Sequence, residues 1–341
     1  MLVIALVVVA GAGGYGVHAY ASYRQTQASA TPVDQMALDT ALDQPHIVFR
    51  STAPGADYGR VAVVPLSDPT GPRAFTPATC DRVYATTSEA MCLRTVRGIP
   101  TTFEADLLNK QWQVERSWPL PGVPSRTRIS ADGSLVATTA FVTGDSYASV
   151  GFSTRTRITG VDGHDYGNIE FYKLIVNGKT IAPVDRNMWG VTFVNDSQFY
   201  ATAASTLYGT TWLVRGNLRA KTLTAIHRNV ECPSVSPDGT RIAFKQATKY
   251  GSGKWHITVL NLKTGVETQL DEPRSVDDQV EWLNNSTLLY GLPRKGSPGE
   301  TDVYSIRVDA HAKPKLFIAD AWSPSVVREI QYRTQPRQSV D

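Results

Sequence analysis

The sequence predicts an all-β protein, a six-bladed β-propeller that follows an apolar N-terminal segment. Three observations lead to this prediction. A hairpin motif recurs along the chain at steps of about 40 to 50 residues, which is the period of propeller blades. Each repeat has room for four short strands. The two ends of the chain supply complementary parts of one blade, and such closure removes free sheet edges.

The clearest copy of the motif is VECPSVSPDGTRIAFKQ, residues 230–246. Pro237 presets φ for the first central position of a type I turn, Asp238 suits the second, and Gly239 supplies a positive φ. The run therefore predicts a tight hairpin between PSVS and RIAFKQ. Related runs occur at 128–133, 191–197, 280–286 and, more weakly, 81–90. The aligned apolar positions are Ala85, Ile129, Phe193, Val235, Trp282 and Trp322.

The blades are expected to fill residues 46–330. The first three strands, HIVFRS, YGRVAVVPL and PRAFTP, need a fourth, which AWSPSVV at 321–327 supplies as the innermost strand. In the fifth unit the hairpin is followed by WHITVLNLKTG and VETQLDEP, a third and a fourth strand joined by a turn. Residues 331–341 form a polar C-terminal tail.

The N-terminal segment is apolar, and no Asp, Glu, Lys or Arg precedes Arg24. Residues 1–23 are therefore long enough to cross a bilayer as a retained anchor. A cleaved signal peptide is the alternative, because Ala19-Tyr-Ala21 resembles a cleavage site. Residues 24–45 are expected to be a polar tether. Either interpretation places the rest of the chain outside the cytoplasm, on the cell membrane or secreted.

The same segment contains a G-x-G-x-x-G pattern, Gly11 to Gly16, with Asp34 about 20 residues further on. A dinucleotide site needs a βαβ unit around this pattern, and the following residues are polar with no second buried strand. We therefore expect no nucleotide and no other cofactor. The net charge of +3 is mild and gives no support for a nucleic-acid partner.

The run VSPDGTRIAF resembles the repeat of TolB-type propellers, also called PD40 or WD40-like repeats. Ser236–Phe244 carries the strong match and Ser130–Gly133 a fair one, within about 280 residues of similar organisation. The resemblance implies an extracytoplasmic six-bladed propeller that commonly serves as a docking module. TolB has an additional α/β domain before its propeller, where this chain has only the short tether. Its partners are therefore not carried over.

Two cysteines, Cys80 and Cys92, are equidistant from the predicted hairpin tip at residue 86. Such positions face each other across antiparallel strands, so an oxidising compartment would allow a disulfide. Two buried thiols are the alternative. Cys232 has no evident partner and is expected to be a buried free thiol.

One step of the repeat, from Ile129 to Phe193, is too long, and we expect the surplus residues at 145–166. A loop there, between the second and third strands of blade three, would lie where the channel opens, and function tends to collect in such loops. The alternative is a solvated β-hairpin without a binding role. A metal site at Asp162, His164 and Asp165 has only ligand spacing in its favour, so we expect none. The candidate binding residues of this loop are Arg155, Arg157, Asp162, His164, Asp165 and Tyr166.

A second candidate cluster consists of the residues just before the aligned apolar positions. Strand alternation aims these side chains alike, toward the channel. Arg128 and Glu281 would meet there and bind something polar, or simply line a water-filled channel. The set is Arg128, Thr192, Ser234, Glu281 and Ala321.

Known catalytic signatures are absent: the sequence has no G-x-S-x-G elbow, no H-E-x-x-H and no Walker A loop. We therefore expect a non-catalytic scaffold of the bacterial cell envelope that binds a protein or a glycan. The alternative is a propeller hydrolase or lyase that uses Glu281, Asp277 and Arg128 at the channel mouth. A channel plugged by side chains favours the scaffold, and a divalent metal ion in the channel favours the enzyme.

Overall fold

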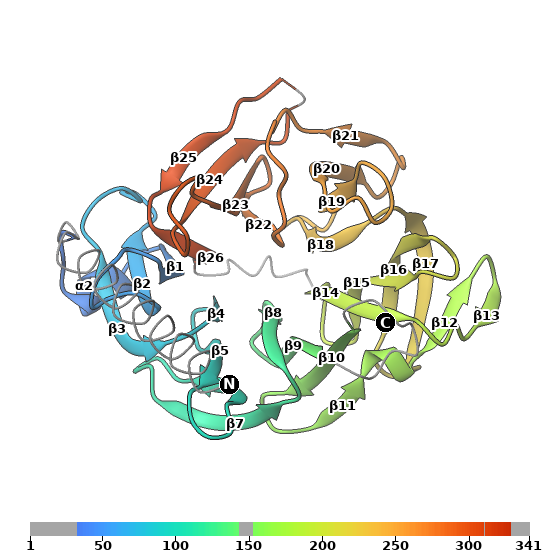
Figure 1. The fold of residues 1–341 in the computed structure, drawn as a ribbon, viewed down its shortest axis with the longest axis horizontal. Helices are drawn as coiled ribbons and strands as arrows, with labels where there is room; N and C mark the ends of the chain where they lie inside the picture. Colours follow the sequence, from blue (N-terminus) through green and yellow to red (C-terminus); the bar gives the residue numbers. More distant parts are fainter. Residues whose placement is uncertain (1–32, 143–152, 310, 329–341) are drawn as a thin grey trace, which may run out of the picture.

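A computed structural model describes residues 33–142, 153–309 and 311–328. Six sheets surround a central axis, one per blade, and they follow one another around the ring in chain order (Figure 1). The six-bladed propeller is therefore confirmed. The segments predicted as an anchor or signal, 1–23, and as a C-terminal tail, 331–341, lie outside the described residues. No helix within the described ranges is long and apolar enough to cross a bilayer.

Blade 1 joins both ends of the described chain, as predicted. It consists of β26 (Ala321–Val327), β1 (His46–Ser51), β2 (Arg60–Pro65) and β3 (Ala74–Thr79). Blade 2 consists of β4 (Arg82–Ala85), β5 (Ala90–Val96), β6 (Thr102–Leu108) and β7 (Val114–Leu120). Blade 3 consists of β8 (Val123–Ile129), β9 (Leu135–Val142), β10 (Ser153–Gly160) and β11 (Asp165–Asn168).

Blade 4 is the widest blade. It consists of β14 (Asn187–Phe193), β15 (Gln198–Ser205), β16 (Thr210–Asn217) and β17 (Thr222–Arg228), with β12 (Lys173–Val176) and β13 (Lys179–Ile181) added outside β17. Blade 5 consists of β18 (Glu231–Val235), β19 (Arg241–Ala247), β20 (Trp255–Asn261) and β21 (Glu267–Gln269). Blade 6 consists of β22 (Glu281–Asn284), β23 (Thr287–Pro293), β24 (Thr301–Arg307) and β25 (Lys315–Ile318).

The long step of the repeat has a different origin from the one expected. The surplus residues form the short 3-10 turn Ile169–Phe171 and the β12–β13 hairpin, and β12 pairs in parallel with β17 at the rim of blade 4. Residues 153–160 and 165–168 are instead the third and fourth strands of blade 3. The prediction of an inserted loop is therefore wrong from residue 153 onward. Residues 145–152 lie outside the described part of the chain.

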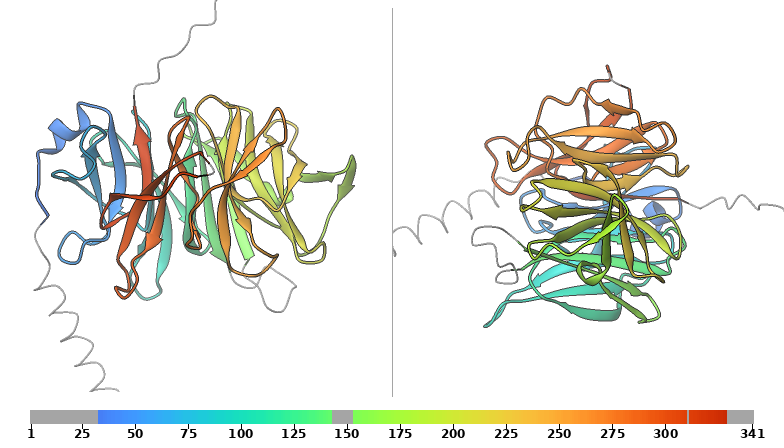
Figure 2. Two further views of the ribbon diagram at one scale, coloured as in Figure 1. Left: turned by 90° about the horizontal axis from the view of Figure 1, so that it is seen from above. Right: turned by 90° about the vertical axis from the view of Figure 1, so that its right-hand side faces the viewer.

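The propeller has two faces with different connections. In an antiparallel blade the turns after the first and third strands lie at one end, which we call the tip face. The loops after the second strands and the loops between blades lie at the other end, which we call the linker face. In the left view of Figure 2 the tip face is at the top, where β26 ends.

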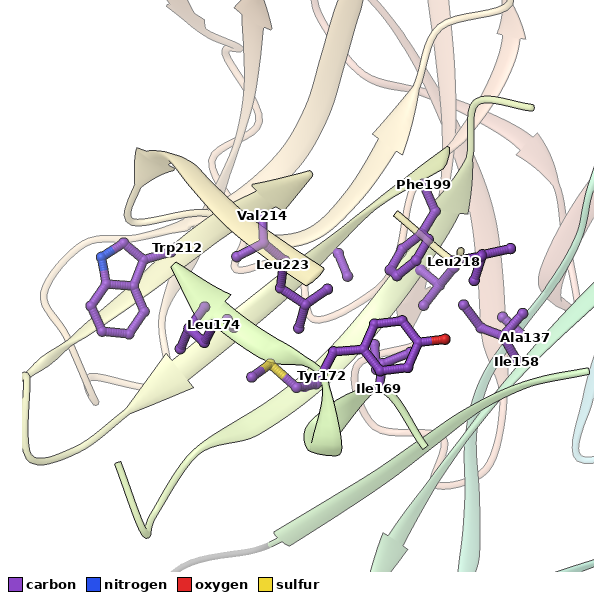
Figure 3. Close-up of a cluster of buried hydrophobic side chains, with 14 of the residues drawn as sticks. Ala137, Ile158, Ile169, Tyr172, Leu174, Phe199, Trp212, Val214, Leu218 and Leu223 are labelled. Atoms are coloured by element: carbon purple, nitrogen blue, oxygen red, sulfur yellow. The ribbon is translucent and has the colours of Figure 1, made fainter. Parts of the chain in front are cut away.

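The core consists of apolar clusters between neighbouring blades. The largest joins blades 3 and 4, where Phe199 and Trp212 pack with Tyr172 and Leu174 from the segment that leads into the extra hairpin (Figure 3). These side chains are almost fully buried. Burying such side chains contributes about 1.5 to 3 kcal/mol each. The added hairpin is therefore an integral part of blade 4.

Part of the predicted tether is folded. Helix α2 (Leu38–Leu42) buries Ala41 in the cluster between blades 1 and 2, and Met36 packs beside it. The backbone of Met36 donates a 2.9 Å hydrogen bond to Arg73, whose own N–H donates to Asp34 over 2.8 Å. Residues 34–45 therefore belong to the propeller, because their apolar side chains complete this cluster.

Candidate functional site

Two adjoining cavities open on the tip face. The mouth cavity, about 430 Å³, lies over the central channel, between the first strands of the blades. The side cavity, about 890 Å³, lies between the end of α2 and the hairpin turns of blades 1 and 2. They share the wall residues Ala85, Thr86, Thr87, Val327 and Arg328, so together they form one cleft. Ligand sites are commonly cavities of this size.

The floor of the mouth cavity is formed by side chains from the first strands. Arg128, Thr192, Ser234 and Glu281 line it, as the strand alternation predicted. Tyr84 of blade 2, which was not in the predicted set, lines it too. In blade 1 the equivalent residue is Ser325, whose hydroxyl accepts a 3.0 Å hydrogen bond from the backbone of Ala85.

The expected alignment at Trp322 and Ala321 is therefore wrong by four residues. Val326 pairs with Ile47 as Val235 pairs with Ile242. The Ser-Pro pair of this strand, Ser323-Pro324, does not form a hairpin turn. It lies at a bulge inside the strand, where Ser323 has a φ of 55°.

Arg128 and Glu281 meet across the channel from opposite blades. Arg128 Nη2 lies 3.5 Å from Glu281 Oε2, and both residues are buried, with 8% and 7% of their surfaces exposed. The guanidinium also donates to the carbonyl of Val280 over 3.2 Å and lies over the Tyr84 ring at 4.6 Å. Tyr84 donates its hydroxyl to Glu281 over 3.3 Å. This group forms a charged strut beneath the cavity.

Burial decides how the strut titrates. Desolvation raises the pKa of Glu281, and the charge of Arg128 offsets only part of that effect. Burial, together with the Glu281 charge, also raises the pKa of Tyr84, which stays a neutral hydrogen-bond donor at physiological pH. The positive charge of Arg128 faces the Glu281 carboxyl group inside the floor of the cavity.

A second layer of side chains fills the channel closer to the linker face. Arg82 of blade 2 lies 3.6 Å from Asp278 of blade 6, and burial lowers the pKa of Arg82 to about 9. Gln279 donates to the backbone carbonyls of Val191 and Pro233 over 3.2 and 2.8 Å, which ties blade 6 to blades 4 and 5. Arg126 reaches the carbonyl of Asp277 over 3.4 Å. The channel is thus plugged in two layers.

Asp277 lies with this second layer and not with Glu281. Its carboxylate accepts a 2.5 Å hydrogen bond from Lys245, which is buried and also lies 3.7 Å from Glu231. These contacts and the charge of Arg126 hold the pKa of Asp277 below its usual range despite partial burial. The three groups expected to act together as an enzyme, Glu281, Asp277 and Arg128, therefore do not converge on one point.

Two residues that line the side cavity each contain an unmatched polar atom. Trp112 Nε1 and one carboxylate oxygen of Glu89 are buried without a hydrogen-bond partner among the described residues. Both residues line this cavity, together with Lys110 and Asn109. Trp112 has a φ of 61°, which is unusual for a bulky side chain. Buried polar groups are normally satisfied, so these two atoms are exceptions, but both are covered by neighbouring atoms and do not face the cavity.

The predicted loop residues lie elsewhere. Arg155 and Arg157 are on β10, Asp165 and Tyr166 are on β11, and Asp162 and His164 are in the tip-face turn between them. Arg157 forms an exposed ion pair with Asp165, and the rings of His164 and Tyr166 meet edge to face at 4.6 Å. None of the six lines either cavity. Within the described ranges, no group of three metal-ligating side chains occurs.

The structure joins Cys80 and Cys92 by a disulfide, with a Cα–Cα distance of 5.4 Å. The strand register differs from the one used to predict this pair, because Cys92 stands opposite Val83. Cys80 therefore reaches its partner from just before β4. Cys232 is a buried free thiol, as expected.

Several channel residues were missed. Arg82 and Arg126 precede Tyr84 and Arg128 by two positions, so the same alternation could have revealed them. Glu89, Lys110 and Trp112 had no such signal, because the side cavity exists only once α2 has docked.

No family model and no curated protein sequence matches the chain. Among solved structures, it is similar to TolB from Acinetobacter baumannii, with a TM-score of 0.56 and 14% identity over 83% of this chain and 67% of that one. A puromycin-hydrolyzing peptidase of Mycobacterium tuberculosis has a TM-score of 0.46 and 13% identity over 81% of this chain and 44% of that one. An oligogalacturonate lyase in complex with manganese has a TM-score of 0.46 and 12% identity over 73% and 72%. The chain therefore has the TolB-type propeller fold.

Proposed function

We propose that this protein is a non-catalytic binding propeller of the bacterial cell envelope. In this proposal residues 1–23 attach it to the membrane, and the tip-face cleft receives an envelope protein or a glycan. The observation that carries the binding role is the combination of an open cleft with a plugged channel. The charges in the floor are already paired, so they hold the blades together and leave the cleft to bind a partner without reacting with it.

The side cavity supports a partner that is both apolar and polar. Its walls combine Trp112, Val48 and Leu42 with amide, hydroxyl and amino groups. An aromatic wall beside amide, hydroxyl and amino groups suits a sugar ring or an extended peptide. The cavity continues into the mouth cavity, which favours an elongated ligand over a small compact one.

The test is crosslinking and pull-down of the full-length protein from its native membranes, with one variant that blocks the cleft. Thr87 is exposed and belongs to the wall shared by both cavities, so Thr87→Trp fills the cleft without disturbing the core. The matched control is Thr264→Trp in an exposed turn of blade 5 that lines neither cavity. We expect the partner to be lost with Thr87→Trp and retained with Thr264→Trp. Equal capture by both variants would exclude the cleft.

A second candidate, a hydrolase or lyase, is favoured by Glu281 alone. A buried carboxyl whose pKa is raised is a typical general acid or base, and Glu281 lies beside the mouth cavity. Glu281→Gln keeps the shape of the side chain and removes the titration. Turnover of an envelope glycan that is abolished by this variant would support the enzyme, whereas unchanged binding of the partner supports the scaffold.

A further inference from the structure

The linker face exposes large apolar side chains at the turns after the second strands of the blades. Ile99 in blade 2 is fully exposed, at 106%, and Leu207 in blade 4 is 71% exposed. Tyr208 beside it, Tyr58 in blade 1 and Tyr250 in blade 5 are also exposed. Single exposed apolar residues need no explanation, but their recurrence at one end of several blades does.

These turns are held in place by hydrogen bonds. In blade 4 the Asp185 carboxylate accepts from the backbone of Leu207 over 2.8 Å and from the Ser205 hydroxyl over 2.7 Å. The same contact places Val184, 70% exposed, beside Leu207. Tyr58 donates its hydroxyl to the carbonyl of Gly299 over 3.1 Å, which joins the turns of blades 1 and 6. The apolar side chains are therefore presented by fixed turns.

The charged side chains within the turns of blades 2 and 5 are positive, whereas Asp57 precedes Tyr58 and Asp185 lies against Leu207. Arg97 is exposed two residues before Ile99, and the exposed Lys249 and Lys254 flank Tyr250. The turns 97–101, 206–209 and 248–254 contain no acidic residue. Aromatic and aliphatic side chains among basic ones match the headgroup region of a bilayer with anionic lipids.

The chain itself indicates what covers this face. Only nine residues, 24–32, separate the uncharged segment 1–23 from residue 33, a reach of at most about 35 Å. Traced back from α2, residues 37 to 33 run along the rim of blade 1 toward the linker face (Figure 2). A bilayer entered by residues 1–23 is therefore within reach of this face.

We infer that the linker face is a lipid-binding surface, held on the bilayer with Ile99, Leu207 and Tyr250 in its headgroup region. The inference rests on the membrane attachment proposed above. The tip-face cleft then points away from the membrane, open to its partner.

The experiment measures the depth of spin labels on the full-length protein in vesicles of phosphatidylethanolamine with a minor fraction of phosphatidylglycerol. Nitroxides are attached to Ile99→Cys, Leu207→Cys and Tyr250→Cys, one at a time. The control positions, Val194→Cys and Val266→Cys, are similarly exposed but lie on the tip face. The native cysteines do not interfere, because one is buried and two form the disulfide.

We expect labels on the linker face to collide with oxygen several-fold more often than with a water-soluble nickel complex, and tip-face labels to show the reverse. If the protein floats with the vesicles but all five labels collide mainly with nickel, the lipid-binding surface is wrong and the attachment still holds. Linker-face labels shielded from both reagents would show a protein partner on this face, which also overturns the inference. A protein that does not float with vesicles refutes the membrane attachment, while the cleft is tested separately by Thr87→Trp.

Discussion

Replacing Arg128 by Met should destabilise the propeller in a strongly pH-dependent manner. The methionine keeps the apolar stem but removes the guanidinium that faces Glu281 at 3.5 Å. Unit charges at this distance attract by about 5 kcal/mol at an effective dielectric constant of about 20. Desolvation offsets part of that attraction, yet leaving one buried partner uncompensated costs about 3 to 5 kcal/mol. We expect a loss of this size at pH 8.

The sign of the pH dependence follows from Glu281. Burial already raises the pKa of this carboxyl in the folded protein, and losing Arg128 raises it further. A group whose pKa is higher in the folded than in the unfolded state favours folding at low pH, and this stabilisation disappears as the pH rises through the folded pKa. The deficit of the variant should therefore be largest at pH 8 and should shrink toward pH 5.

The assay is denaturant unfolding of the wild type and Arg128→Met across this pH range, with thermal unfolding as a check. A loss of 3 to 5 kcal/mol corresponds to about 6 to 10 °C for a domain of this size. The double variant Arg128→Met/Glu281→Gln removes the stranded charge and should lose most of the pH dependence. A deficit below about 1 kcal/mol at pH 8, or one that is constant with pH, would refute the strut as described.

Three further predictions concern stability. Removing the disulfide by Cys80→Ala/Cys92→Ala should cost at most about 3 kcal/mol in denaturant unfolding, because the bond closes a short loop with a sequence separation of 12. Gly190→Ala should destabilise more than Gly209→Ala. Both glycines have positive φ. A Cβ added at Gly190 would lie 2.7 Å from the backbone of β18, whereas a Cβ added at Gly209 would meet no atom within 4 Å beyond its chain neighbours. Burial raises the pKa of Glu170 to about 7, so stability should fall as pH rises from about 4.5 through 7. Glu170→Gln should remove that fall, and an unchanged profile would contradict the assignment.

The blade count was predictable because it depends on local turn chemistry repeated at a fixed period. Pro237 and Gly239 specify a hairpin whatever surrounds them, and the closing strand 321–327 was identified for the same reason. Its register was not, because Ser323-Pro324 imitates the turn residues while lying inside a strand. The β12–β13 hairpin was missed because its short strands carry little periodic signal of their own. They are stabilised by the packing of Leu174, which belongs to β12, in the cluster that contains Trp212.

The channel pair of the site was predictable and the cleft was not. Alternation along two strands places Arg128 and Glu281 toward one axis, so their meeting required only the correct blade count. The side cavity depends on where α2 docks, and a five-residue helix with one buried alanine carries too weak a pattern to reveal that contact. Trp112 becomes a candidate only after the docked helix has built a wall opposite it.

The plugged channel has a consequence for how the two faces act. Two layers of paired charges, Arg128 with Glu281 and Arg82 with Asp278, cross the described channel between the tip face and the linker face. Arg128 and Glu281 join blades 3 and 6, which are opposite in the ring, and Arg82 and Asp278 join blade 2 to the start of blade 6, so paired charges fill the channel between the cleft and the linker face. Substitutions at Thr87 and Ile99 should therefore add independently in binding and membrane assays, since distant sites without shared partners do not couple. In the proposed membrane-attached arrangement the propeller would act as a spacer that holds its cleft at a constant height above the bilayer.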